Sequence, residues 1–382
     1  MTRYNKNKHI IVILLAVLFL FYNSYAQNQW DENGIKVADA TAPLINFQAV
    51  SDDSGNVYLT YQDISSAGDY DIFVQKLSPP GICEWSYPDT IVTNAVENDK
   101  LPSIAIDGSG GVFVAWERII NGDTTWIYIQ HINSDGSKSW TEPKRVCNKD
   151  TLRQVKIISD NNNGVFVVWK DKGNDEGDIY AQHFTSTGNS WSKEVAVTTA
   201  SGSQSNYQLM CTDSGDLIVV WVDERNGNRD LFTQKISAAG TAEWTSNGRE
   251  IVTETSDQYQ PCIEKCGTYY IITWTDKRTD SGDIYAQLIN DNGNFQWLSE
   301  IPICNASYAQ DASRIAESCS SSAIITWWDS RSGGGYDVYA QRIDSLGNVS
   351  WTIAVNNSSS IQYLPEITSD GAGGAFVVWM DS

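Results

Sequence analysis

The sequence predicts an all-β fold, a β-propeller of about seven four-stranded blades whose closing blade is incomplete. Three recurring features predict it: an aromatic residue that ends a β-rich run, a phrase like DIYAQ, and a tryptophan after a glycine-bearing turn. The first feature recurs every 52 to 55 residues, and the other two keep step with it. A period of this size is typical of propellers and other repeat architectures.

Each repeat can be divided into four strands, which we call A to D. Runs of β-branched and aromatic residues, separated by Gly, Asn, Asp and Ser turns, predict them. Strand A is short, as in PEITSD, and strand B is the apolar run that ends in the first aromatic residue. Strand C carries the DIYAQ phrase and strand D begins at the third feature. Four antiparallel strands per repeat are typical of blades that close into a ring.

The repeat boundaries predict one propeller domain over residues 27–382, after a signal peptide at 1–26. Residues 28–40 supply a lone strand D to the closing blade, and residues 361–382 supply only strands A and B. The chain is therefore expected to be a C-terminally truncated copy of a longer protein. The full units lie roughly at 41–97, 98–151, 152–203, 204–257, 258–310 and 311–360.

The N-terminus resembles a secretory signal. Arg3, Lys6 and Lys8 precede an apolar run at residues 10–21, and Ser24-Tyr25-Ala26 offers a small-x-small cleavage site. The run is short for a membrane span, so a retained anchor is the less favoured alternative. We expect export to the extracellular space or cell surface, with the periplasm as the alternative, and no transmembrane segment after cleavage.

Composition narrows the range of partners. The net charge is -21, and such an acidic surface repels phosphate backbones, which argues against nucleic acid. The seven cysteines have no metal-site spacing, and they are expected to be small core residues with one or two disulfides possible.

Residues that recur at one register are expected to be structural, because a site is needed once and a packing solution in every blade. The tryptophans are assigned to the core, and the glutamine of every DIYAQ copy to hydrogen bonds with a neighbouring strand. The Asp and Arg of the W-x-D-x-R phrase are expected to brace the B to C loop. Acid-base chemistry, a clamp on a carboxylated sugar, and calcium are the alternatives, and no run fits the Asp-x-Asx-x-Asx-Gly calcium loop.

Departures from the repeat are the candidate ligand-binding residues. Arg118 replaces the usual Asp and Trp126 replaces the strand C Asp, so this pair could stack on a sugar or be a local packing change. The linkers from strand D to strand A offer further amides, carboxylates and tyrosines at the ring entrance. At what we take to be a shared register these are Asp99, Gln204, Gln258, Asp311 and Gln362, with Tyr259 and Tyr363 next along. No catalytic residue, metal ligand or cofactor is predicted.

Phrases such as SGDIYAQLINDNGNFQW resemble the repeats of exported, mostly uncharacterised propeller proteins of Bacteroidetes-type bacteria. That resemblance implies a C-terminal sorting domain for type IX secretion in the full-length protein. More distantly, NDNGNFQW is similar to the Asp-box of sialidases, with one extra residue before the tryptophan and without the sialidase catalytic pattern.

The sequence therefore favours a binding or display module for glycans or proteins without catalysis. A sialidase-like glycoside hydrolase or lyase, and a purely structural segment of a larger adhesin, remain the alternatives.

Overall fold

A computed structural model describes residues 36–38, 45–64, 68–85, 90–93, 95–122, 124–173, 177–279, 281–319, 321–333, 335–358 and 360–382. These residues form six four-stranded antiparallel sheets and one two-stranded sheet, each with its strands in chain order. The fold class predicted from the sequence is confirmed. The predicted signal peptide, and all of the predicted strand at 28–40 except residues 36–38, lie outside the described residues.

The strands have the following bounds, and each sheet is one blade. Strands A are β1 (Ile45–Ser51), β5 (Asn98–Ile106), β9 (Leu152–Ser159), β13 (Gln204–Cys211), β17 (Gln258–Cys266), β21 (Gln310–Ser318) and β25 (Gln362–Ser369). Strands B are β2 (Val57–Ile64), β6 (Val112–Asn121), β10 (Gly164–Asp171), β14 (Leu217–Asp223), β18 (Tyr269–Asp276), β22 (Ser322–Asp329) and β26 (Ala375–Asp381). Strands C are β3 (Tyr70–Leu77), β7 (Thr124–Ile132), β11 (Asp178–Thr185), β15 (Asp230–Ile236), β19 (Asp283–Ile289) and β23 (Asp337–Asp344). Strands D are β4 (Thr90–Ile91), β8 (Lys144–Arg145), β12 (Val195–Thr198), β16 (Arg249–Val252), β20 (Ile301–Cys304) and β24 (Val349–Asn356).

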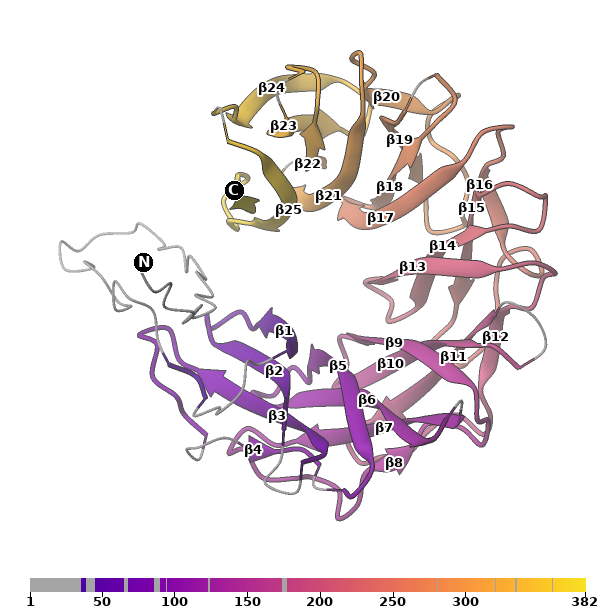
Figure 1. Cartoon of the computed structure of the whole chain (residues 1–382). Coiled ribbons are helices and arrows are strands. Elements are labelled where there is room, and N and C mark those ends of the chain that lie inside the picture. The colour runs from indigo at the N-terminus through magenta and orange to yellow at the C-terminus, as the bar shows by residue number, and fades with distance from the viewer. Residues whose placement is uncertain are drawn as a thin grey trace, which may run out of the picture.

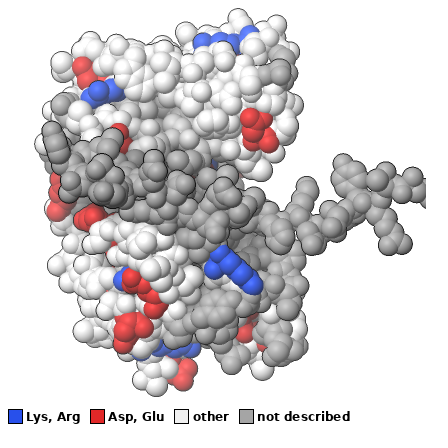
Figure 2. All heavy atoms as spheres, turned by 90° about the vertical axis from the view of Figure 1, so that its left-hand side faces the viewer, with Lys and Arg blue, Asp and Glu red and all other residues white. Residues whose placement is uncertain are grey.

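The seven blades follow one another around a ring, with strands A innermost (Figure 1). The described strands leave the ring open between β1 of blade 1 and β25 of blade 7. On the side that holds this opening, charged side chains lie in small separate groups on a mostly uncharged surface (Figure 2). The described part of that side therefore carries no single patch that would account for the net charge.

The core lies between the blades, where the tryptophans of strands B are packed. Trp116, Trp169, Trp221, Trp274 and Trp327 are fully buried, as the repeat predicts. Each stacks on the aromatic residue of the DIYAQ phrase in its own blade, with ring centroids 6.1 to 6.3 Å apart. Four cysteines, Cys147, Cys211, Cys266 and Cys304, are buried thiols in this core.

In blades 1, 2, 3 and 5 the third recurring tryptophan bonds through its indole N–H to a backbone carbonyl of the next blade. Trp85 donates its indole N–H to the carbonyl of Ser134 in the following blade, 3.0 Å away. A Cβ added to Gly136 in the same turn would lie 2.8 Å from the Trp85 ring, and the φ of Gly136 is +82°. Only glycine fits this contact without strain, which explains the glycine of each C to D turn.

The glutamine of the DIYAQ phrase is buried in all six copies, as predicted. In blade 4, Gln234 accepts from the backbone N–H groups of Lys235 and Trp244 and donates to the carbonyl of Thr245. Strand D is short and irregular at this point, so the amide supplies hydrogen bonds that a longer ladder would otherwise provide.

Candidate binding site at the inner strands

Two neighbouring residue pairs, each formed by one residue of strand A and one of strand B, determine which side chains lie at the inner end of each blade. We call the position of each pair a register. The first, which we call the cage register, pairs the Asp of the W-x-D phrase with a residue near the start of strand A, as in Asp223 with Gln204. The second, the mouth register, lies one residue away on each strand, as in Val222 with Ser205. Both registers lie where strands A begin and strands B end, which we call the upper end of the ring.

In blades 4 to 6 the cage register holds a cation between a carboxylate and an aromatic ring. Asp223 is fully buried and accepts from the Trp221 indole at 2.8 Å and from the Arg225 guanidinium at 2.6 Å. The same guanidinium lies 3.9 Å from the centroid of the Phe232 ring. Asp276 with Arg278, and Asp329 with Arg331, repeat this arrangement. The predicted Asp-Arg brace is thus found in three blades.

Blade 3 fills the same cage with a lysine from the linker that precedes strand A. The Lys149 ammonium lies 2.9 Å from the carboxylate of Asp171 and 3.4 Å from the centroid of the Tyr180 ring. Blade 3 therefore uses a lysine where blades 4 to 6 use an arginine, but the cation still lies between the carboxylate and the aromatic ring.

In blade 2 the carboxylate of the cage comes from strand A, and the cation stands at the position where other blades have the aspartate. Asp99, in strand A, now supplies the buried carboxylate, and Arg118, at the usual Asp position, supplies the cation. Arg118 donates to Asp99 through Nε at 2.7 Å and through Nη2 at 2.8 Å, and it lies 4.5 Å from the centroid of the Tyr128 ring. Among the described residues the buried indole N–H of Trp116 has no hydrogen-bond partner, and neither has that of Trp169 in blade 3.

A β-bulge with a left-handed residue opens every strand A directly beside the mouth register. Seven residues adopt this conformation, each with φ between 49° and 57°: Asn46, Leu101, Gln154, Asn206, Gln260, Ala312 and Leu364. Left-handed backbone is costly for side chains other than glycine, and its recurrence in seven blades shows that the inner wall depends on it. The bulge turns main-chain groups toward the neighbouring blade, as where Gln154 donates its N–H to Glu117 at 2.5 Å.

The mouth register, unlike the cage, holds a different pair in every blade. The pairs are Ile45 with Gln62, Lys100 with Glu117, Arg153 with Lys170, Ser205 with Val222, Tyr259 with Thr275, Asp311 with Trp328, and Tyr363 with Met380. Charged side chains gather in blades 2 and 3, and aromatic ones in blades 5 to 7. This wall is where one sector of the ring differs from another.

Blades 5 to 7 present an aromatic cluster, which we define as Tyr259, Trp328, Tyr336 and Tyr363, all half-buried. Trp328 stacks on Tyr336 with ring centroids 4.7 Å apart and lies 6.4 Å from the ring of Tyr363. Within the described residues, the buried indole N–H of Trp328 has no hydrogen-bond partner. Burial raises the pKa of Tyr259, and the charges of Asp311, Asp257 and Tyr336 raise it further.

Asp311 is the carboxylate that belongs to this cluster, since it is paired with Trp328 across the ladder. One of its oxygens accepts from the Thr275 hydroxyl at 2.9 Å and from the Ala312 N–H at 2.7 Å. Burial raises the pKa of Asp311 in spite of these hydrogen bonds. In the described part of the chain Asp311 has no ion pair, so its negative charge stands beside the aromatic rings.

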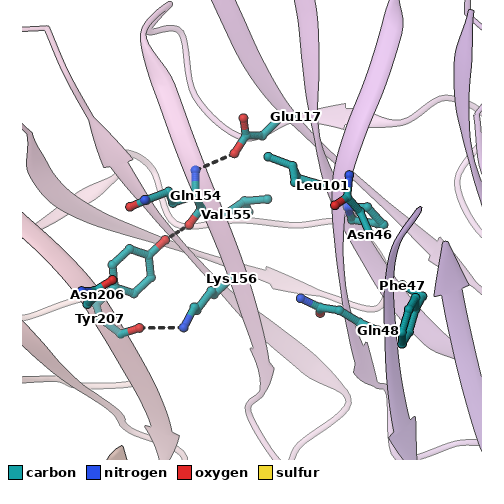
Figure 3. A pocket seen from close by; sticks show the side chains of 11 residues that line it. Asn46, Phe47, Gln48, Leu101, Glu117, Gln154, Val155, Lys156, Asn206 and Tyr207 are labelled. Carbon is teal, nitrogen blue, oxygen red and sulfur yellow. Dashed lines mark hydrogen bonds between the residues drawn. The ribbon is translucent and has the colours of Figure 1, made fainter. Parts of the chain in front are cut away.

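Blades 1 to 4 border a cavity of about 410 Å³ between their inner strands (Figure 3). Glu117, Lys156 and Tyr207 are its ionisable lining groups, and amide side chains from Asn46 and Gln48 line the opposite wall. Burial raises the pKa of Glu117, whose carboxylate accepts the N–H of Gln154. Burial also lowers the pKa of Lys156.

The candidate residues proposed from the sequence fall into three groups. Gln204, Gln258 and Gln362 are fully buried in the cage register, where each donates to carbonyl groups of its own linker. Tyr259 and Tyr363 lie in the mouth register within the aromatic cluster. The register assigned to Asp311 was wrong: Gln310 pairs with the W-x-D aspartate, and Asp311 is equivalent to Tyr259 and Tyr363. The linker before β21 has the same length as those before β13 and β17, so the cage position falls one residue earlier than the sequence suggested.

Arg118, Asp99 and Trp126 have partners within blade 2. Arg118 and Asp99 neutralise one another in the cage, which is the compensated packing change that the sequence left open. Trp126 donates its indole N–H to Asp150 at 2.7 Å and lies under the Arg145 guanidinium, 3.9 Å from the ring centroid. None of the three belongs to the aromatic cluster.

Sequence reasoning missed Trp328, Tyr336, Glu117 and Lys156. The signal for two of them was the middle position of the W-x-D phrase, which holds Trp328 in blade 6 and Glu117 in blade 2 and differs in every blade. Among the described residues, no group of three or more His, Cys, Asp or Glu side chains is arranged to hold a metal ion. These residues also include no apolar helix of the length that a membrane crossing requires.

Comparison with known proteins supports the fold. No family model matches the chain, and neither does any curated protein. An ulvan lyase is similar at 10% identity and a TM-score of 0.52 over 84% of each chain. A puromycin hydrolase is similar at 13% identity and a TM-score of 0.50, over 87% of this chain and 49% of that one.

A Hadza microbial sialidase is similar at 14% identity, with a TM-score of 0.45 over 76% of this chain. The present chain spans 63% of the length of that sialidase. At the identities of the ulvan lyase and the puromycin hydrolase, the shared feature is the fold alone.

Proposed function

We propose that this protein is an exported binding module for glycans and that the aromatic cluster of blades 5 to 7 is its binding site. The observation that carries the proposal is the group formed by Trp328, Tyr336 and Tyr363, half-buried side chains brought together at the upper end of the ring. The export part of the proposal rests on the N-terminal sequence alone.

The chemistry of the cluster suits a sugar. Sugar rings present C–H faces that pack on aromatic rings, while their hydroxyls need a few placed donors and acceptors. The half-buried Trp328 offers its ring, and Asp311 offers a carboxylate. The ammonium of Lys277 lies 4.9 Å from the centroid of the Tyr259 ring, so a cation borders the same surface.

The cluster is also supported by rigid elements. Trp328, Asp311 and Tyr363 stand on strands, and the loop residue Tyr336 is fixed because its carbonyl accepts the N–H of Gln362 at 2.8 Å. A site whose rings are already placed loses little side-chain entropy on binding. This arrangement favours recognition over a merely structural role.

A glycan-array screen tests the proposal, with the wild-type protein beside Trp328→Ala. Saturable binding to one sugar class is expected, and the variant should bind at least about 10-fold more weakly because the central ring of the cluster is removed. Trp126→Ala is the matched control, since Trp126 is another half-buried tryptophan of the same face with its own partners.

The remaining outcomes separate the alternatives. Loss of binding in Trp126→Ala alone would move the site to blade 2. Release of shortened sugars from a bound glycan would establish a hydrolase or lyase instead of a binder. If a folded sample bound no glycan on the array, the proposal would be overturned.

A further inference from the structure

Lys156 is a half-buried cation that lines a cavity between inner strands, and its ammonium lies 5.5 Å from the centroid of the Tyr207 ring. It stands on β9 in the wall of the inner cavity, and its ammonium donates to the carbonyl of Tyr207 at 2.8 Å and to the amide oxygen of Gln208 at 3.0 Å. Both partners are neutral. In the described part of the chain Lys156 has no ion pair.

Other cations of the inner wall are neutralised where they are buried. Lys149 has Asp171 at 2.9 Å, Arg118 has Asp99 at 2.7 Å, and Arg314 has Glu366 at 3.0 Å. Removing a charge from water without a partner of opposite sign is costly, and proteins seldom retain such a charge. Among the described residues Lys156 lacks such an ion pair, as does Lys100 of the mouth register, whose ammonium lies 5.1 Å from the centroid of the Tyr70 ring.

The surroundings of Lys156 shift its pKa in both directions. Burial lowers the pKa, the nearby Cys262 raises it, and the positive charge of Arg314, on the inner strand of blade 6, lowers it. Glu117 is the carboxylate of the cavity, but it is committed to the N–H groups of the blade 3 bulge. An anion that enters the cavity would relieve the imbalance.

The cavity has room and donors for such an anion. Its volume of about 410 Å³ suits a monosaccharide-sized group. An ammonium has three N–H donors and two are used within the protein, which leaves one for a ligand. Asn46 and Gln48 face the same space from blade 1, and Lys156 lies between Gln48 and Tyr207 in Figure 3.

We propose that Lys156 binds a carboxylate carried by the glycan, so that the sugars recognised are acidic ones such as uronic acids. This inference rests on the proposed glycan-binding function and names its ligand class. One positive charge without an ion pair matches one carboxylate, and the cavity that Lys156 lines lies between the inner strands of blades 1 to 4.

The experiment titrates the strongest array ligand into the wild type, Lys156→Met and Lys156→Arg, and repeats the titration with the carboxyl-reduced form of that ligand. The wild type should bind the acidic form at least about 10-fold more tightly than the reduced form, as a charged hydrogen bond implies. Lys156→Met should abolish this preference, and Lys156→Arg should keep most of it. Lys193→Met, at an exposed position, should bind like the wild type.

The outcomes distinguish this inference from the function on which it rests. Strong binding of neutral glycans, with no gain from a carboxylate, would overturn the role of Lys156 and leave the binding module standing. Preference for sulfate esters over carboxylates would overturn the ligand class. No binding to any glycan would overturn both, and thermal unfolding of each variant shows whether the protein is still folded.

Discussion

The cage register and the mouth register lie one residue apart on the same strands, yet they have opposite characters. In the cage, blades 2 to 6 place a cation between a carboxylate and an aromatic ring, even where the residues that supply them change. In the mouth, no two blades hold the same pair. In a repeat protein, positions that make the same interaction in successive repeats maintain the fold, whereas positions whose residues differ between repeats can form a binding site.

The reason for the difference is geometric. The cage faces the tryptophan core, where a buried charge needs its partner, so every change must be compensated. In the mouth, the strand A residues are half-buried or exposed, whereas five of the strand B residues are buried: Gln62, Glu117, Lys170, Val222 and Thr275. Substitution on strand A has the smaller structural cost, and selection for a ligand can act there.

The largest expected effect comes from substituting the same residue type in each register of blade 6. Asp329→Ala leaves Arg331 without its carboxylate and Trp327 without its acceptor, and it should cost about 3 to 5 kcal/mol of unfolding free energy. Asp311→Ala removes a half-buried carboxylate whose ionisation is already disfavoured, and it should cost less than about 1 kcal/mol. Denaturant unfolding of both variants measures the contrast, and equal costs would refute it.

A smaller effect tests whether blade 2 has an exchanged cage or two unrelated changes. Asp99→Ala and Arg118→Ala should each destabilise the protein, because each leaves the other charge buried alone. The double variant should be more stable than the sum predicts, with a coupling energy of about 2 kcal/mol. Additive costs in a double-mutant cycle would show that the pair is not a cage.

These contrasts also show what the sequence could reveal. The blades, their four strands, the core tryptophans and the buried glutamines follow from residues that recur, because recurrence is visible in one chain. In the sequence, Arg118 is a departure from the W-x-D phrase and Asp99 is one of the linker residues, so each was given a possible binding role and nothing connected the two. The structure pairs Asp99 with Arg118 across the ladder, so the charge of each residue is explained by the opposite charge of the other.

The aromatic cluster was hidden for a different reason. Its members come from Tyr259 to Tyr363, and the ring brings them together through three blades that no local pattern connects. Trp328 also follows the core residue Trp327 directly, so the sequence suggests that it belongs to the core as well. The sequence signal for the site is that the residue at one register differs between blades. This signal can be recognised only after the positions of the β-bulges show how the strands A of different blades align.

The smallest expected effect is a difference in the sign of pH dependence between the two registers. Burial alone would raise the pKa of Asp329, but hydrogen bonds from Arg331 and Trp327 outweigh it and hold the pKa below its ordinary value of 3.8. Asp329 therefore contributes stability that is present above pH 3.8 and is lost as the pH falls through its folded pKa. In the mouth, burial raises the pKa of Glu117 above its ordinary value of 4.5, so stability is lost as the pH rises from 4.5 toward the folded pKa.

Glu117→Gln and Asp329→Asn should change the pH profile of stability in opposite ways. Glu117→Gln keeps an acceptor for the Gln154 N–H and removes the ionisation, so it should lose less stability than the wild type between pH 4.5 and pH 7. Asp329→Asn should be destabilised at pH 7, with the deficit shrinking as the pH falls below 3.8. Denaturant unfolding at several pH values follows both profiles. Parallel profiles would mean that the two registers share one electrostatic environment, and the distinction between scaffold and site would then have to rest on side-chain variation alone.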